Sequence, residues 1–177
     1  YYGAKEIAES FRTVRKNTIQ VAEDIPEDKY SYRAAPDTMS VAEMLAHLAA
    51  ITHWAEQCFF VEKKTNVSME DFGRWMGELG AKGKALTTKA QIVDALKSEG
   101  EKFAKLLDGL SEAQLAQPIT APNATKSAFE MLIGIKEHEM HHRAQLFLIE
   151  RMVGIAPHLT RARMERSAQQ QAAPARS

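Results

Sequence analysis

Apolar residues recur every three or four positions along four segments of this chain, and this spacing limits the possible folds more than any other feature. In the first segment, residues 4–23, Ile7, Phe11 and Val14 fall on one side of a helix. Few strand-like alternations interrupt the helical pattern. The sequence therefore predicts an all-α protein.

The remaining helical segments are predicted from their periodicity and their end signals. Ser40 and Glu43 have the spacing of a capping box at the start of the second segment. Residues 66–87 contain four glycines, and we interpret them as a long crossover with at most a short helix over residues 69–76. The predicted segments run over residues 40–63, 88–109 and 127–153. Four helices with a long connection between the second and third are typical of a four-helix bundle.

The chain is predicted to form one domain followed by a tail. It has 177 residues with 45% hydrophobic composition, and no Gly/Ser/Pro-rich linker divides it. Beyond Pro157 the sequence is dominated by Arg, Gln, Ala and Ser, which bury too little apolar surface to order a packed domain. We therefore predict a bundle over residues 1–155 and a polar, disordered tail over residues 156–177.

Charge and cysteine content exclude several classes of function. The chain has 23 basic and 23 acidic residues, so no general electrostatic attraction to nucleic acid or to an anionic membrane is expected. Cys58 is the only cysteine, which excludes an intrachain disulfide and a cysteine-based zinc finger. Neither an apolar run of membrane-spanning length nor a signal peptide is visible. We expect a cytoplasmic protein that acts on a small molecule.

The segment His138-Glu139-Met140-His141-His142 holds the strongest chemical signal. His138 and His142 are one helical turn apart, and they share an apolar stripe with Ile135 and Leu146. Both imidazoles are therefore expected to point into the core, where they can act as a pair of metal ligands. Gln145 lies on the same stripe, where it either faces a cofactor or substrate, supports a ligand, or is structural.

His47 is the candidate for a third ligand. It lies on the inner face of the second helix together with Met44 and Ile51. A lone core histidine is more often hydrogen-bonded scaffolding than a ligand, but three inward imidazoles are stronger together. They are a suitable donor set for zinc or a nickel-like divalent ion.

The same segment also matches H-E-x-x-H, the zinc-protease pattern in which the Glu is the general base. The longer metzincin motif is absent, because Gln145 and Leu148 occupy its Gly and third His positions. No strand pattern provides a peptide-binding edge, and Glu139 is expected to face away from the metal. The residues predicted on the polar side of this helix are Lys136, Glu139, Arg143 and Glu150. A protease is therefore disfavoured.

Two segments resemble the DinB/YfiT-like superfamily. Residues 33–48 (RAAPDTMSVAEMLAHL) resemble the entrance to the second helix of that family, and residues 137–146 (EHEMHHRAQL) resemble its H-x-x-x-H-R-x-Q signature. The family commonly has Gly where this chain has Ala144. The resemblance implies a four-helix bundle with a three-histidine divalent-metal site, whose ligands match His47, His138 and His142.

The resemblance also implies a range of functions. Characterised relatives include transferases and isomerases that use a low-molecular-weight thiol, so a metal-dependent thiol transferase is expected, with the metal holding the thiol as thiolate. A metal-binding stress protein without turnover and a metal-dependent hydrolase are the alternatives.

A second apolar stripe on the last helix bears on the oligomeric state. Ile133, Met140, Ala144 and Phe147 lie opposite the metal face, whereas a bundle helix normally needs one apolar stripe. Relatives often look dimeric, so we expect a homodimer.

Overall fold

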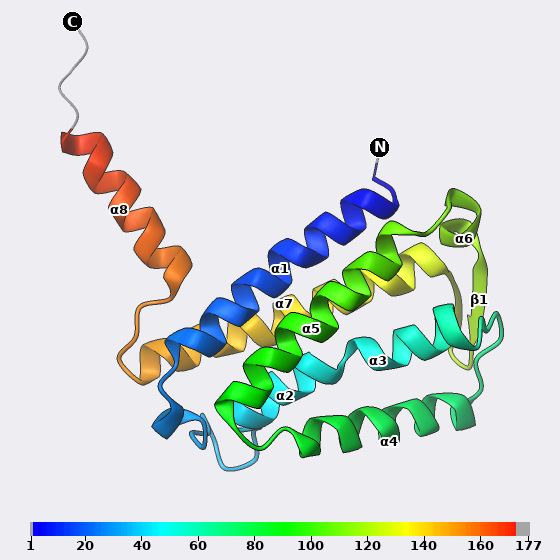
Figure 1. Cartoon of the computed structure of the whole chain (residues 1–177), viewed down its shortest axis with the longest axis horizontal. Coiled ribbons are helices and arrows are strands. Elements are labelled where there is room, and N and C mark those ends of the chain that lie inside the picture. Colours follow the sequence, from blue (N-terminus) through cyan, green and yellow to red (C-terminus); the bar gives the residue numbers. More distant parts are fainter. Residues whose placement is uncertain (1, 173–177) are drawn as a thin grey trace, which may run out of the picture.

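The protein folds as a bundle of long helices, seen in a computed structural model that describes residues 2–172 (Figure 1). The long members of the bundle are α1 (Ala4–Asp24), α2 (Val41–Ala50), α5 (Lys89–Asp108) and α7 (Ala128–Met152). Helical structure continues from α2 through α3 (Thr52–Ala55) and a π-helical turn, η2 (Glu56–Val61). The predicted all-α bundle is confirmed.

Several short elements connect the long helices. They are η1 (Glu27–Lys29), α6 (Glu112–Ala116) and an antiparallel hairpin of β1 (Pro118–Ala121) and β2 (Ala124–Ser127). In the hairpin Ala121 pairs with Ala124 next to the turn. The hairpin precedes α7 and so lies at the end of the bundle where α7 begins (Figure 1).

Capping residues explain where the long helices begin. The Ser40 hydroxyl accepts a hydrogen bond from the Glu43 amide, and the Glu43 carboxylate accepts one from the Ser40 amide at 2.8 Å. Thr88 and Ser127 accept hydrogen bonds in the same way at the starts of α5 and α7. Each cap satisfies amides that a helix start otherwise leaves unpaired. The capping-box prediction is therefore confirmed.

The core is formed mainly by α1, α2, α5 and α7, in two large clusters of buried apolar residues, and a smaller cluster lies near the hairpin. Phe11 and Phe103 are fully buried and pack edge to face, with their ring centroids 5.2 Å apart. Burying one side chain of this size contributes about 1.5–3 kcal/mol. Within residues 2–172 no helix combines the length and apolar character needed to cross a bilayer.

One helix, α4 (Met69–Ala85), lies where the sequence predicted a crossover with at most a short helix. Ser68 caps it reciprocally with Asp71. Trp75 and Leu79, one turn apart, are buried and attach it to the bundle. This packing offsets the cost of its glycines, about 1 kcal/mol each. The prediction of a crossover was wrong because the number of glycines does not reveal that Trp75 and Leu79 form a buried stripe on a helix.

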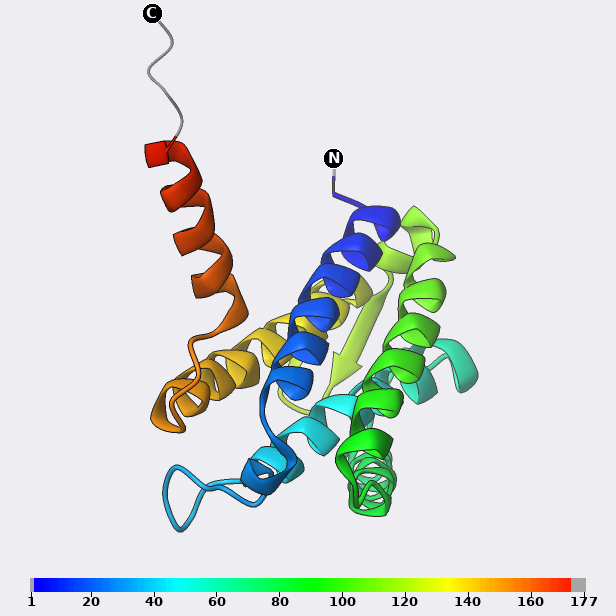
Figure 2. The same ribbon diagram turned by 60° about the vertical axis from the view of Figure 1, so that its left-hand side comes forward.

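A further helix, α8 (His158–Ala172), lies within the segment predicted as a disordered tail. It points away from the bundle in both views (Figures 1 and 2). Its first turn is held to α1, because Arg161 pairs with Asp24 and His158 hydrogen-bonds Asn17. Residues 173–177 of the predicted tail lie outside the described residues.

Candidate metal centre

Three histidines converge between α2 and α7. His47 comes from α2, whereas His138 and His142 come from α7. Each offers one ring nitrogen, and these three nitrogens all lie within 4.8 Å of one another. The Nε2 atoms of His47 and His138 are 2.7 Å apart. The structure thus brings together the three residues that the sequence selected from separate segments.

Local packing explains why these side chains turn inward. Buried residues flank the histidines of α7, since Ile135 is 2% and Leu146 0% exposed. On α2, Met44 and Leu48 lie in the core on either side of His47. A helical stripe therefore sets the direction of each ring.

Burial controls the protonation of the cluster. Burial, and secondly the neighbouring rings of His138 and His142, lower the pKa of His47 to about 4. Burial also lowers the pKa of His138 and that of His142. All three rings are therefore neutral at pH 7, which is the form that binds a metal. Three neutral imidazoles are a fitting donor set for Zn²⁺ or Ni²⁺.

Gln145 supports one of the three rings. The Nδ1 atom of His142 and Oε1 of Gln145 are 2.8 Å apart. Because an amide oxygen only accepts, Nδ1 carries the proton and Nε2 of His142 keeps its lone pair. Gln145, which the sequence suggested as a cofactor-facing or supporting residue, thus fixes the tautomer of His142. Partners of this kind orient ligands in metal sites.

A cavity of about 400 Å³ opens beside the cluster, with His47 and His138 in its wall. Trp54 extends from α3 on one side, and Phe72 and Met76 of α4 form another. These two α4 residues were not predicted to line a site, because the sequence does not show that their segment packs against the bundle through Trp75 and Leu79. The candidate metal site formed by the three histidines therefore lies at the edge of a mainly apolar chamber.

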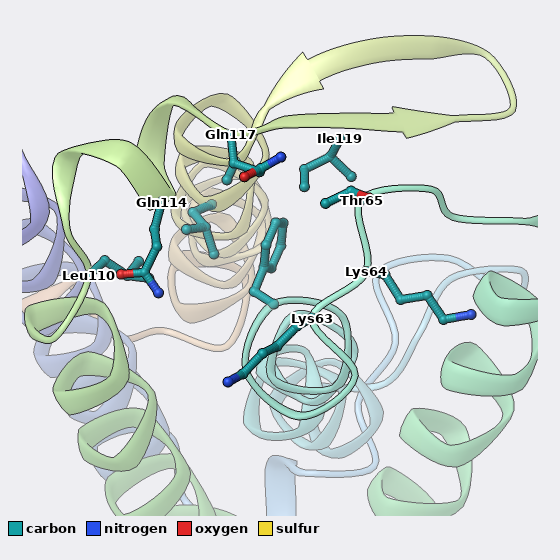
Figure 3. A pocket seen from close by; sticks show the side chains of 10 residues that line it. Lys63, Lys64, Thr65, Leu110, Gln114, Gln117 and Ile119 are labelled. Atoms are coloured by element: carbon teal, nitrogen blue, oxygen red, sulfur yellow. The ribbon is translucent and has the colours of Figure 1, made fainter.

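Another cavity, of about 210 Å³, lies near the hairpin and lacks comparable chemistry (Figure 3). Its lining contains Lys63, Gln114 and Gln117 but no histidine. The amino group of Lys64 points away from the other lining side chains (Figure 3). It donates a hydrogen bond to Asp71 at 2.7 Å. Its lining therefore provides no cluster of metal ligands.

The predicted polar side of α7 is partly wrong. Glu139 and Glu150 are both 0% exposed. Glu139 is bound by the Nε and Nη2 atoms of Arg15 at 2.9 Å each. Arg15 lies four residues after Phe11 on the buried side of α1. This position of a basic residue was the sequence signal that could have predicted a buried partner for Glu139. The carboxylate is engaged by Arg15, so the protease role of Glu139 as a free general base is not supported.

Cys58 is not a nucleophile in this arrangement. It is fully buried, and burial raises the pKa of its thiol to about 11. The thiol therefore stays protonated at neutral pH, and Cys58 packs as a small apolar residue of the core.

Comparisons with known proteins agree with this architecture. The sequence profile of the DinB superfamily matches residues 10–146. The uncharacterized protein YjoA of Bacillus subtilis (strain 168) is 29% identical over 154 residues, which cover 85% of this chain and 91% of YjoA. The crystal structure of YjoA, described as a DinB-like protein, aligns with a TM-score of 0.58 at 26% identity, over 84% of this chain and 92% of that one. The chain therefore belongs to the DinB superfamily.

Proposed function

We propose that this protein is a divalent-metal-dependent transferase that uses a low-molecular-weight thiol as cosubstrate. The observation that supports the metal part is the convergence of three neutral imidazoles with their nitrogens within 4.8 Å. Catalytic zinc sites typically have three protein ligands and one open position. The thiol part rests on the family resemblance, since characterised relatives include transferases that use such a thiol. The match of His47, His138 and His142 to the ligands of the family's metal site supports that resemblance.

His47, His138 and His142 would hold the ion, and zinc or nickel suits this donor set. When bound, the ion supplies a positive charge that keeps a thiol in its thiolate form at neutral pH. Gln145 keeps Nε2 of His142 unprotonated, so this ring is ready to bind. The burial that lowers the pKa of His47 keeps a proton from competing for its ring nitrogen.

The chamber beside the histidines would hold the electrophile. Trp54 and Phe72 present apolar surface there. In the reaction a sulfur–carbon bond forms, and the bond from that carbon to the leaving group breaks. If the electrophile is an epoxide, the ring oxygen leaves the carbon and takes up a proton equivalent to the one lost by the thiol.

The test is a transfer assay on zinc- and nickel-loaded protein with bacillithiol, mycothiol or glutathione and a panel of epoxides and alkyl halides. We expect turnover that requires both metal and thiol and that His142→Ala abolishes. His53→Ala is the matched control, because His53 binds Glu78 at 2.7 Å and is not one of the three converging histidines.

Two other results would contradict the proposal. Turnover without any added thiol would indicate a metal-dependent hydrolase. Stoichiometric metal binding without turnover across the panel would indicate a metal-binding stress protein.

A further inference from the structure

We infer that the molecule bound at this site carries a long apolar tail, and that the tail lies in a groove running from His47 and His138 to the β1–β2 hairpin. The identity of the reactive head rests on the proposed function. The tail site rests on separate observations: the arrangement of two cavities, the apolar character of the residues that line them, and the glycine at position 134.

The groove consists of two adjacent cavities. The first is the chamber of about 400 Å³ beside the histidines. The second, of about 340 Å³, reaches Val67, Trp75 and the hairpin residue Ala121. The two share a wall of four residues: Trp54, Phe72, Lys126 and Met131. They therefore lie end to end, with the histidines at one end and the hairpin at the other.

The shared wall is able to open. Phe72 is 42% exposed, and the Lys126 side chain is 51% exposed with only a surface ion pair to Glu130 at 3.2 Å. Met131 is flexible because its side chain is unbranched. Rotation of these side chains joins the two cavities without movement of a helix.

The residues that line the two cavities favour an apolar ligand. Apart from the two histidines, the polar side chains that line the two cavities are Asn123, Lys126 and Glu130. Each cavity alone falls in the volume range of small-ligand pockets, about 300–1,000 Å³. An alkyl or aryl tail can bury its surface there, while its polar head meets the imidazoles.

A glycine keeps the first cavity open. Gly134 lies in the interior of α7, one turn before His138, in the wall of the first cavity. A Cβ atom built at Gly134 would have nothing within 4 Å. Glycine weakens a helix interior, so its presence here is not explained by helix stability. A larger side chain at this position would enter the space that the tail occupies.

The experiment measures binding of two series of probes with tails of 4 to 12 carbons, the n-alkyl hydroxamic acids and the corresponding n-alkyl amides. Both tryptophans of the chain, Trp54 and Trp75, line the groove, so their fluorescence reports binding directly. We expect affinity to rise about fourfold per methylene until the groove is filled.

Two variants locate the tail. Ala121→Phe fills the hairpin end, and we expect it to weaken the longest probes by at least about tenfold and to leave four-carbon probes unchanged. Gly134→Leu narrows the first cavity, and we expect it to weaken probes of every length without lowering the melting temperature. Ala116→Phe is the matched control, because Ala116 is exposed on α6 and lines neither cavity.

The two probe series separate this inference from the proposed function. Amide binding to metal-free protein reports the tail site alone, and the extra affinity of a hydroxamate in zinc-loaded protein reports the metal. Length-dependent amide binding without a zinc-dependent gain would support the tail site and contradict the metal function. Affinity independent of tail length, or unchanged in Ala121→Phe, would overturn the tail site even if zinc binding persists.

Discussion

Arg15 of α1 and Glu139 of α7 form an ion pair inside the bundle, one residue from His138. Their side chains are only 4% and 0% exposed. The guanidinium also donates to the carbonyl of Leu48, the residue after His47, and to the carbonyl of Leu96 on α5. One side chain therefore links α1, α2, α5 and α7 at the level of the histidines.

We predict that Glu139→Leu lowers the free energy of unfolding by about 3–5 kcal/mol, because it leaves the Arg15 guanidinium buried without a countercharge. Urea denaturation measures the change. The double variant Arg15→Met/Glu139→Leu should recover most of the loss, because it leaves no unpaired charge. Glu9→Gln, which removes an exposed partner of Arg12, is the control and should cost less than about 1 kcal/mol. A loss of similar size in the control and in Glu139→Leu would contradict the prediction.

Gly100 on α5 makes room for the side chain of Arg15. A Cβ atom built there would lie 2.7 Å from Cγ of Arg15. We predict that Gly100→Ala destabilises the protein, although alanine favours a helix by about 1 kcal/mol. Gly134→Ala is the matched control, because its Cβ meets open space, and it should stabilise by up to about 1 kcal/mol. Thermal denaturation of both variants checks the sign, and stabilisation by Gly100→Ala would refute the close contact.

The sequence predicted the bundle and the convergence of its histidines because both depend on helical periodicity. His47 and His142 could be placed on inner faces without knowing what lies opposite. Glu139 could not, because a helical wheel assigns a charge to the surface unless a buried partner is known. That partner, Arg15, lies 124 residues away in the sequence. The chamber beside the histidines was also beyond reach, since its α4 wall depends on the packing of Trp75.

Gln145 is predicted to tune metal affinity. Gln145→Leu removes the acceptor for Nδ1–H of His142, which frees the ring to rotate or change tautomer. We expect zinc affinity to fall about 10- to 100-fold. Gln145→Glu keeps an acceptor oxygen and should retain the affinity. Competition with a chromogenic chelator provides the measurement, and unchanged zinc affinity in Gln145→Leu would exclude this role.

Glu150 is predicted to make stability depend on pH. Both carboxylate oxygens are buried without a hydrogen-bond partner. Burial, and secondly the charge of Asp24, raises the pKa of Glu150 from 4.5 to about 7. Between these values the folded protein keeps a proton that the unfolded chain has lost. The contribution of this group to stability therefore falls as pH rises from 4.5 to about 7 and is level above it.

The variant Glu150→Gln should remove this dependence. We expect it to be more stable than the parent by about 1–3 kcal/mol at pH 8 and nearly equal to it at pH 4.5. Urea denaturation at the two pH values measures the difference. Glu137→Gln, an exposed change on the same helix, should show no such pH-dependent gain. A gain of the same size at both pH values would rule out titration of Glu150.

The outer face of α7 is predicted to form a homodimer. Met140, Leu148 and Met152 are 43%, 59% and 50% exposed, and they follow one another at helical spacing together with the exposed Ala144. Phe147, which the sequence placed on this stripe, instead packs against the core. We expect a dimeric mass in light scattering at micromolar concentration and a monomeric mass for Leu148→Glu, because the charge would be buried in the interface. Val61→Glu changes an exposed apolar residue away from α7 and should leave the dimer intact. A monomeric mass for the unmodified protein would show that this stripe faces solvent.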